Sequence, residues 1–113
     1  MMSSAIHGII DARLGDAESS WNMFLDLLQH FRGDYLLVSE APCNETISLL
    51  TGICGMLQLV MIGWGGLQIQ ENGLKAAPNL PAEIKSLKIR GFHYMGETYD
   101  LSVNGSVFNL EKV

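Results

Sequence analysis

The stretch Ile62-Gly63-Trp64-Gly65-Gly66-Leu67-Gln68-Ile69 decides the fold of this chain, because the pattern of apolar residues changes across it. Before residue 65 the apolar residues recur at helical spacing, and after it they alternate with polar residues in short runs broken by turn residues. We therefore expect an α+β chain, with helices in residues 1–64 and a small antiparallel β-domain in residues 65–113.

Three helices are predicted in the first part. The first spans Ala5 to Leu14, with Ser3 or Ser4 as its N-cap. Asp16 is expected to cap a second helix that runs to about Phe31. One face of that helix would carry the apolar residues Trp21, Phe24, Leu25, Leu28 and Phe31. A third helix, from about Ile47 to Ile62, is apolar all round, which is typical of a helix buried in a larger protein.

The second part reads as short strands joined by tight turns. Two Asn-Gly pairs, Asn72-Gly73 and Asn104-Gly105, predict hairpins. The alternating segments are Leu67–Ile69, Leu74–Ala76, Leu87–Phe92, Tyr99–Val103 and Val107–Leu110. We expect Phe92, His93 and Tyr94 to belong to the packing of this sheet, since His93 has no partner at a spacing suited to a metal or acid–base site.

Composition excludes several kinds of function. The 113 residues are 48% hydrophobic and carry a net charge of −5 without any basic cluster, so nucleic acid and anionic membranes are not expected as partners. Cys43 and Cys54 are predicted to be free thiols, Cys54 within a buried helix, and no Cys/His spacing indicates a metal site. We expect neither metal nor cofactor. Acceptor patterns at Asn44 and Asn104 favour a secreted or vacuolar/lysosomal protein.

A membrane-spanning segment is an alternative for Thr46 to Gln70, which carries no charge. Glycines and glutamines interrupt that stretch, and no Lys or Arg flanks it, so anchors are lacking. A buried helix is the preferred interpretation.

The run Tyr35-Leu36-Leu37-Val38-Ser39-Glu40 ends in a carboxylate beside much apolar sequence. Apolar surroundings raise the pKa of a carboxyl group, which is how Glu becomes a general base or acid near neutral pH. A solvated strand end is the alternative for Glu40.

Four blocks, taken in order, resemble the C-terminal end of glycoside hydrolase family 65, and most closely its acid-trehalase-like hydrolases. The helix ending in Ala12-Arg13-Leu14-Gly15-Asp16 resembles the family's "ARLGD" segment, and Ser39-Glu40 its "SE" or "TE" segment. Two later blocks resemble its "FLTGAGGFLQ" and "YGGLRI … LP … FRGLHYRG" segments: Leu49–Gln58, and Gly65–Ile69 with Leu80-Pro81 and Ile89–Gly96. The resemblance implies the last helices of an α/α toroid over residues 1–64, followed by an antiparallel β-domain over residues 65–113.

The resemblance also implies chemistry, the cleavage of an α-linked glucose disaccharide or glucoside with inversion. Glu40 matches the general base of the family's hydrolases. An inverting enzyme needs a second carboxyl group about 6.5–9.5 Å away, to leave room for the attacking water. Glu45 and Glu18 are poor candidates for that acid, which in the family comes from earlier in the toroid. The chain is therefore expected to hold half of a catalytic pair, with an N-terminal part of the parent chain as its partner.

Phosphorolysis is disfavoured by the same comparison. The family's phosphorylases hold phosphate with a His near the position of Leu49 here, together with serines near Ser3 and Ser4, which a helix N-cap explains instead. The prediction is thus the C-terminal fragment of an inverting α-glucoside hydrolase, a trehalase first, with kojibiose and glucosyl-galactosyl-hydroxylysine also compatible. The isolated chain is expected to be inactive. The alternative is a non-catalytic relic or a carbohydrate-binding or packing module.

Overall fold

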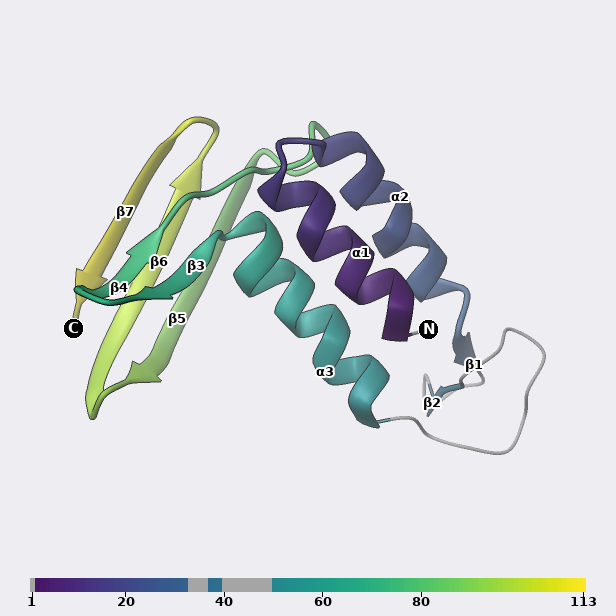
Figure 1. The fold of residues 1–113 in the computed structure, drawn as a ribbon, viewed down its shortest axis with the longest axis horizontal. Coiled ribbons are helices and arrows are strands. Elements are labelled where there is room, and N and C mark those ends of the chain that lie inside the picture. The colour runs from purple at the N-terminus through teal and green to yellow at the C-terminus, as the bar shows by residue number, and fades with distance from the viewer. Residues whose placement is uncertain (1, 33–36, 40–49) are drawn as a thin grey trace.

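The fold, seen in a computed structural model that describes residues 2–32, 37–39 and 50–113, combines helices with antiparallel strands. Figure 1 shows the helices on one side and a twisted sheet on the other. The predicted α+β class is confirmed. The helices end at Trp64 and the next strand begins at Leu67, where the change of pattern was expected.

Helix α1 spans Met2–Arg13, so its start was predicted too late. Ser3 and Ser4 lie inside the helix, and the prediction that one of them is the N-cap is wrong. The hydroxyl of Ser4 instead donates a hydrogen bond to Oδ2 of Asp26 at 2.6 Å, across to the second helix. Ser4 therefore bonds to a residue on another helix instead of capping its own helix.

Helix α2 spans Ala17–Leu28, and Asp16 is its N-cap as predicted, with Oδ1 accepting from the backbone N–H of Ser19 at 2.9 Å. The helix ends three residues before the expected Phe31. Its predicted apolar face is partly wrong, because Leu25 and Leu28 are exposed, whereas Ser20 and Leu27 are buried. The face of α2 that meets the other helices runs through positions 20, 24 and 27. Beside it, the rings of Trp21, Phe24 and Trp64 pack together.

Helix α3 spans Leu50–Gln58 and continues directly into a π-helix, η1, over Leu59–Trp64. Residues 47–49 of the predicted helix lie outside the described residues. The expectation of burial is only partly met, because Leu50 and Leu57 are 70% and 54% exposed. Cys54 is likewise exposed, which corrects the prediction of a buried thiol, and it is free as expected. Among the described residues, no helix is long and apolar enough to cross a membrane.

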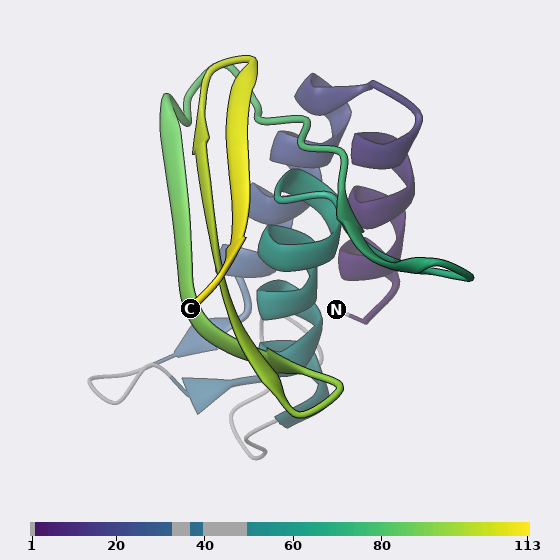
Figure 2. The same cartoon turned by 90° about the vertical axis from the view of Figure 1, so that its left-hand side faces the viewer.

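Among the described residues, the strands form three separate antiparallel sheets rather than one. β1 (Phe31–Arg32) pairs with β2 (Leu37–Val38), and β3 (Leu67–Gln70) pairs with β4 (Gly73–Ala76). The larger sheet has the order β5-β6-β7, and its strands are Ser86–Tyr94, Glu97–Asn104 and Val107–Lys112. Figure 2 shows this sheet as a layer beside the helices. Both predicted hairpins are present, because Gln70 pairs with Gly73 and Asn104 pairs with Val107.

A β-bulge interrupts the pairing of β5 with β6 between Ile89 and Phe92. Gly91 sits in it with φ +67°, and its backbone N–H donates to Oδ1 of Asp100 at 2.8 Å. His93 is exposed and contacts Thr98 Oγ1 at 3.1 Å, so its predicted place in the packing is wrong. Strand alternation explains this, since Phe92 and Tyr94 take the inner face and His93 the outer one.

Two apolar clusters meet at shared residues. One, centred on Leu27, Val38 and Leu59, holds the helices together. The other, centred on Leu101 and Val103, lies under the sheet. Leu80 and Leu87 pack against both clusters, so the connection between β4 and β5 joins the helical part to the strands.

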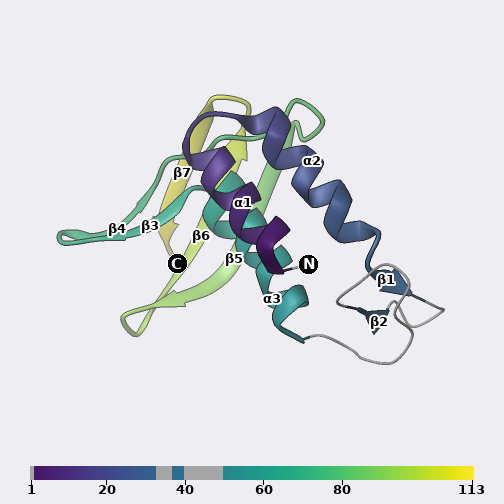
Figure 3. The same ribbon diagram turned by 45° about the vertical axis from the view of Figure 1, so that its right-hand side comes forward.

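The β1–β2 pair lies at the opposite end of the helices from the β3–β4 hairpin (Figures 1 and 3). The segment that leads to the predicted catalytic Glu40 is therefore supported by the helices, not by the larger sheet.

Candidate functional site

The segment that enters the predicted site is tied to the end of helix α2. Phe31 pairs with Val38, and the next residues out on each strand, His30 and Ser39, form three hydrogen bonds. The backbone N–H of Ser39 donates to the carbonyl of His30 at 2.9 Å, and the Ser39 hydroxyl donates to the same carbonyl at 3.3 Å. The ring nitrogen Nδ1 of His30 lies 2.9 Å from the carbonyl oxygen of Ser39.

The direction of this third hydrogen bond follows from chemistry. A carbonyl oxygen can only accept, so Nδ1 of His30 must carry the proton. The bond is well shielded from water, since His30 is 5% exposed and Ser39 is 2% exposed. A buried polar contact of this kind is costly to break, because the groups left behind would lose their partners without gaining water.

Local sequence explains why the chain turns here. The backbone N–H groups of Gln29 and His30 donate to the carbonyls of Asp26 and Leu27, at 3.2 and 3.1 Å, which closes the last turn of α2. The chain then becomes extended at Phe31. Leu27 and Val38 are fully buried on either side of this turn and anchor both ends of the segment in the helical core.

The predicted site residues fall into two groups. Glu40, the expected general base, lies outside the described residues, as do Glu45, Leu49 and Cys43. Glu18, set aside as an acid because of its place on an amphipathic helix, is exposed in the first turn of α2. The structure therefore describes the approach to the predicted base through Ser39, and does not describe the base itself.

Sequence reasoning missed His30. The residue follows an amphipathic helix and precedes an extended segment, and nothing in its spacing to other residues indicated chemistry. Its contact with Ser39 became visible only through the pairing of Phe31 with Val38, which brings residue 39 opposite residue 30.

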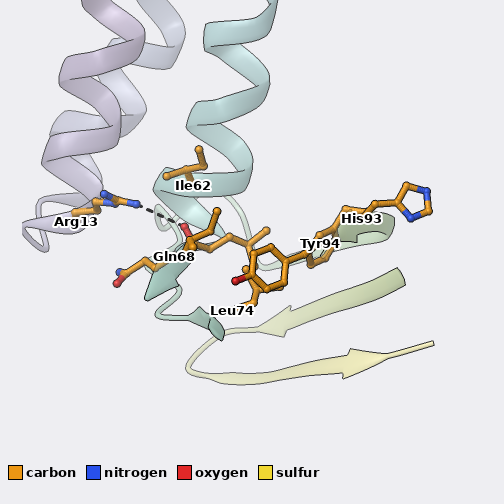
Figure 4. A pocket seen from close by; sticks show the side chains of 9 residues that line it. Arg13, Ile62, Gln68, Leu74, His93 and Tyr94 are labelled. Atoms are coloured by element: carbon orange, nitrogen blue, oxygen red, sulfur yellow. Dashed lines mark hydrogen bonds between the residues drawn. The ribbon is translucent and has the colours of Figure 1, made fainter. Parts of the chain in front are cut away.

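Apart from this segment, the structure has a hollow where the helices meet the strands (Figure 4). It has a volume of about 310 Å³. Its walls come from η1, the β3–β4 hairpin and the end of β5, and are mostly apolar. The lining residues are Arg13, Ile62, Leu67, Gln68, Ile69, Leu74, Phe92, His93 and Tyr94.

Polar groups in this hollow are few and spread apart. Nη2 of Arg13 donates to the carbonyl of Leu67 at 3.5 Å at one end. Figure 4 shows the ring of Tyr94 reaching toward Leu74, while the ring of His93 points away. Such a surface suits the packing of apolar groups better than acid–base chemistry, which needs paired titratable groups. No cluster of three or more His, Cys, Asp or Glu side chains suited to a metal occurs among the described residues.

Comparison with known proteins identifies relatives for most of the chain, although no family model matches it. It is 35% identical over 77 residues, or 68% of its length, to a protein-glucosylgalactosylhydroxylysine glucosidase of Dictyostelium discoideum. It is 31% identical over 104 residues, or 89% of its length, to a kojibiose hydrolase of Flavobacterium johnsoniae.

A solved structure described as a candidate kojibiose phosphorylase from the human microbiome shares the fold. The TM-score is 0.76 at 20% identity, over 97% of this chain and 15% of that one. The chain spans 11% of the length of the Dictyostelium relative and 15% of the length of the Flavobacterium relative. These relatives are named as glycoside hydrolases or phosphorylases, and each is several times longer than this chain.

Proposed function

We propose that this chain, whose homologues are of the glycoside hydrolase family 65 type over their C-terminal region, forms part of an inverting α-glucoside hydrolase. The observation that carries the proposal is the ordered series of family blocks that contains Ser39-Glu40, in a chain related to enzymes named glucosidase and hydrolase.

Glu40 is proposed as the general base that activates water on the face opposite the leaving group. The buried hydrogen bonds between His30 and Ser39 support this role, because a base must be presented from a rigid support. In an inverting mechanism the second carboxyl group acts as general acid across the substrate. We propose that this acid comes from another part of the polypeptide that carries the sequence.

Exposed apolar residues support the proposal that the chain works as part of a larger body. On α1, Ile6 and Ile10 are 57% and 47% exposed. On α3, Leu50, Cys54 and Leu57 follow one another at helical spacing on an exposed stripe. A hollow of about 130 Å³ lies between the two helices, lined by Ala5, Ile6, Ile9, Thr51, Gly55 and Gln58. Several exposed apolar side chains on neighbouring helices are typical of an interface. The proposed division into residues 1–64 and 65–113, with the first part belonging to an α/α toroid, fits this surface.

Hydrolysis is proposed rather than phosphorolysis, because Leu49 stands near the position where the resemblance places a phosphate-binding His. Trehalose, the substrate expected first from the sequence, now has less support than the other two candidate substrates. The relatives named above act, by their names, on glucosylgalactosylhydroxylysine and on kojibiose. We therefore place those two substrates ahead of trehalose.

The decisive experiment measures glucose release by the polypeptide that contains this sequence from glucosylgalactosylhydroxylysine, kojibiose and trehalose. The Glu40→Gln variant should lose nearly all turnover while keeping its melting temperature, because the amide cannot take a proton from water. Glu18→Gln, at an exposed helix position, is the matched control and should be unchanged.

Three other results would redirect the proposal. Turnover of Glu40→Gln at the wild-type rate would remove Glu40 from the mechanism. Release of glucose 1-phosphate that depends on added phosphate would show phosphorolysis. If the longer polypeptide binds a glucoside saturably without cleaving it, the alternative of a carbohydrate-binding module would replace hydrolysis.

A further inference from the structure

We infer that the hollow between the β3–β4 hairpin and the end of β5 receives an extended segment from the remainder of the longer polypeptide, in which an apolar side chain stands near a carboxylate. The segment adds a strand to the outer edge of β3 and brings its carboxylate to Arg13. This inference rests on the part of the proposed function that places the chain in a larger body, and it does not depend on the role of Glu40.

The β3–β4 hairpin has an apolar face that is covered at its base and open at its tip. That face carries every other residue of each strand: Leu67, Ile69, Leu74 and Ala76. Leu67 is only 7% exposed, and Leu74 and Ala76 pack beside it in the cluster under the sheet. Ile69 lines the hollow and is nevertheless 75% exposed. The tip therefore presents an uncovered apolar side chain to an apolar hollow of about 310 Å³.

The outer edge of β3 can take another strand. Figures 2 and 3 show the hairpin extending beyond the helices and the larger sheet. The backbone N–H of Ala77 donates to the carbonyl of Gly66 at 3.0 Å, so the ladder hydrogen bonds join the even-numbered residues 66, 68 and 70 to β4. The N–H and carbonyl groups of Ile69 therefore point away from β4. Among the described residues no third strand lies along that edge, and an open strand edge is a site for strand addition.

Arg13 stands at the same edge as a cation without a carboxylate partner. Its Nη2 donates to the carbonyl of Leu67 at 3.5 Å, and this carbonyl points outward as the Ile69 groups do (Figure 4). Within the described part of the chain, no Asp or Glu forms an ion pair with Arg13. None of the nine residues that line the hollow is acidic, although the chain has 12 Asp and Glu against 7 Lys and Arg. The charge at this edge therefore favours an anionic group in the occupant.

The remainder of the longer polypeptide is a better occupant than a second copy of the chain. The chain spans 11% and 15% of the two relatives named above, so most of their length lies outside the matching region. A segment of the same polypeptide meets the hollow at a high effective concentration. A second copy would instead bring another net charge of −5 toward a chain of the same charge.

The test places the photo-crosslinking residue p-benzoylphenylalanine at position 69 of the longer polypeptide. Position 70 is the matched control, because Gln70 is exposed on the opposite, polar face of the same strand. We expect a crosslink from position 69, within one polypeptide, to a segment outside residues 1–113 that has an Asp or Glu within about three residues of the crosslinked site, which is the reach of an extended chain along this edge. Position 70 should lose most of that product. Mass spectrometry identifies the segment and separates internal crosslinks from those between molecules.

Three results would overturn the inference. One is a crosslink that joins two polypeptides, since it would place a second copy in the hollow. The others are an absence of crosslinking at position 69, which would leave the hollow open, and a crosslink to a segment without a neighbouring carboxylate.

A charge exchange tests the contact at Arg13. Arg13→Glu should lower the melting temperature of the longer polypeptide by at least about 3 °C more than Lys88→Glu, which makes the same change of charge at an exposed position of β5. Replacing the crosslinked segment's carboxylate by Lys should restore the melting temperature of Arg13→Glu and not that of Lys88→Glu. Equal losses in the two variants, or no restoration, would contradict the inference. Glucose release by Glu40→Gln tests the proposed catalytic function separately, because none of these variants lies in the segment that carries Glu40.

Discussion

Trp64 and Ser20, 44 residues apart in the sequence, are joined by a buried hydrogen bond of 2.8 Å from the indole Nε1–H to the serine hydroxyl. The hydroxyl of Ser20 in turn donates to the carbonyl of Gly8 at 2.8 Å. One small side chain therefore links α1, α2 and the end of η1. Trp64 is 3% exposed and Gly8 is buried, so neither partner of Ser20 could turn to water in its place.

Ser20→Ala is expected to destabilise the chain by about 1–3 kcal/mol, because the buried Trp64 N–H loses its acceptor and the Gly8 carbonyl its donor. Urea unfolding followed by tryptophan fluorescence measures the change. Ser86→Ala, at an exposed position in β5, is the control and should shift stability by less than about 0.5 kcal/mol. Equal unfolding midpoints for the two variants would show that the Ser20 contacts are not needed.

Gly66→Ala is expected to destabilise by more than about 3 kcal/mol. Gly66 has φ +65°, and an added Cβ would come within 2.0 Å of the carbonyl oxygen of Ala77. That atom is backbone, held by the hydrogen bond from the Ala77 N–H to the Gly66 carbonyl at 3.0 Å, so it cannot move aside cheaply.

Gly73→Ala is the control for this substitution. Gly73 also has a positive φ, +118°, but its added Cβ would meet open space. Its cost should be limited to backbone strain, about 1–3 kcal/mol. Thermal melts of both variants make the comparison, and a Gly73 variant that is the less stable of the two would contradict it.

Cys54 should react readily with a maleimide in the isolated 113-residue chain, because its side chain is exposed on α3. In the longer polypeptide the same thiol should be protected, if the exposed stripe of Leu50, Cys54 and Leu57 is an interface. Cys43 and Cys54 lie on the same tryptic peptide, residues 33–75, so tandem mass spectrometry of that peptide assigns the label, and Cys54→Ser provides the blank. Equal labelling rates in both contexts would place the interface elsewhere.

Leu57→Lys tests the same stripe by stability. In the isolated chain the change should be within about 0.5 kcal/mol, because Leu57 is 54% exposed there. In the longer polypeptide the buried, unpaired ammonium group should cost several kcal/mol. Asn22→Lys, at an exposed position on α2, should be harmless in both.

Lys112 and Glu97 form an ion pair of 2.8 Å between β7 and the start of β6, with side chains 56% and 49% exposed. Solvent screens such a pair, so Lys112→Met should cost less than about 1 kcal/mol. Repeating the urea titration at high salt should reduce the difference from wild type further. A loss that is large and independent of salt would mean that the lysine stem, rather than its charge, matters.

Much of the fold could be predicted from short-range pattern. The N-cap at Asp16, the hairpins at residues 70–73 and 104–107, and the change from helix to strand near residue 65 all depend on neighbours within a few positions. The errors lie where distant contacts compete with local preference. Ser4 was assigned to a cap and instead bonds to Asp26, and His93 was assigned to the packing and instead lies outward beyond a bulge.

The candidate site also has a part that could be predicted from local sequence and a part that could not. Family blocks in the sequence are enough to nominate Glu40, since they are matched residue by residue along the chain. His30 could not be nominated, because its link to Ser39 exists only once β1 pairs with β2. The register of β1 on β2 follows from which side chains the core buries, here Val38, and strands of two residues are too short to show an alternating pattern in the sequence.

By itself the sequence predicted most of the helices and strands, the turns that join them and the carboxylate to nominate as the base, because these depend on local geometry and residue identity. Only the tertiary structure decided which faces are buried, that a histidine at the end of α2 holds Ser39, and that apolar residues on α1 and α3 are left uncovered. These features arise from packing between segments far apart in the chain, where burial of apolar surface and satisfaction of buried polar groups outweigh local propensity.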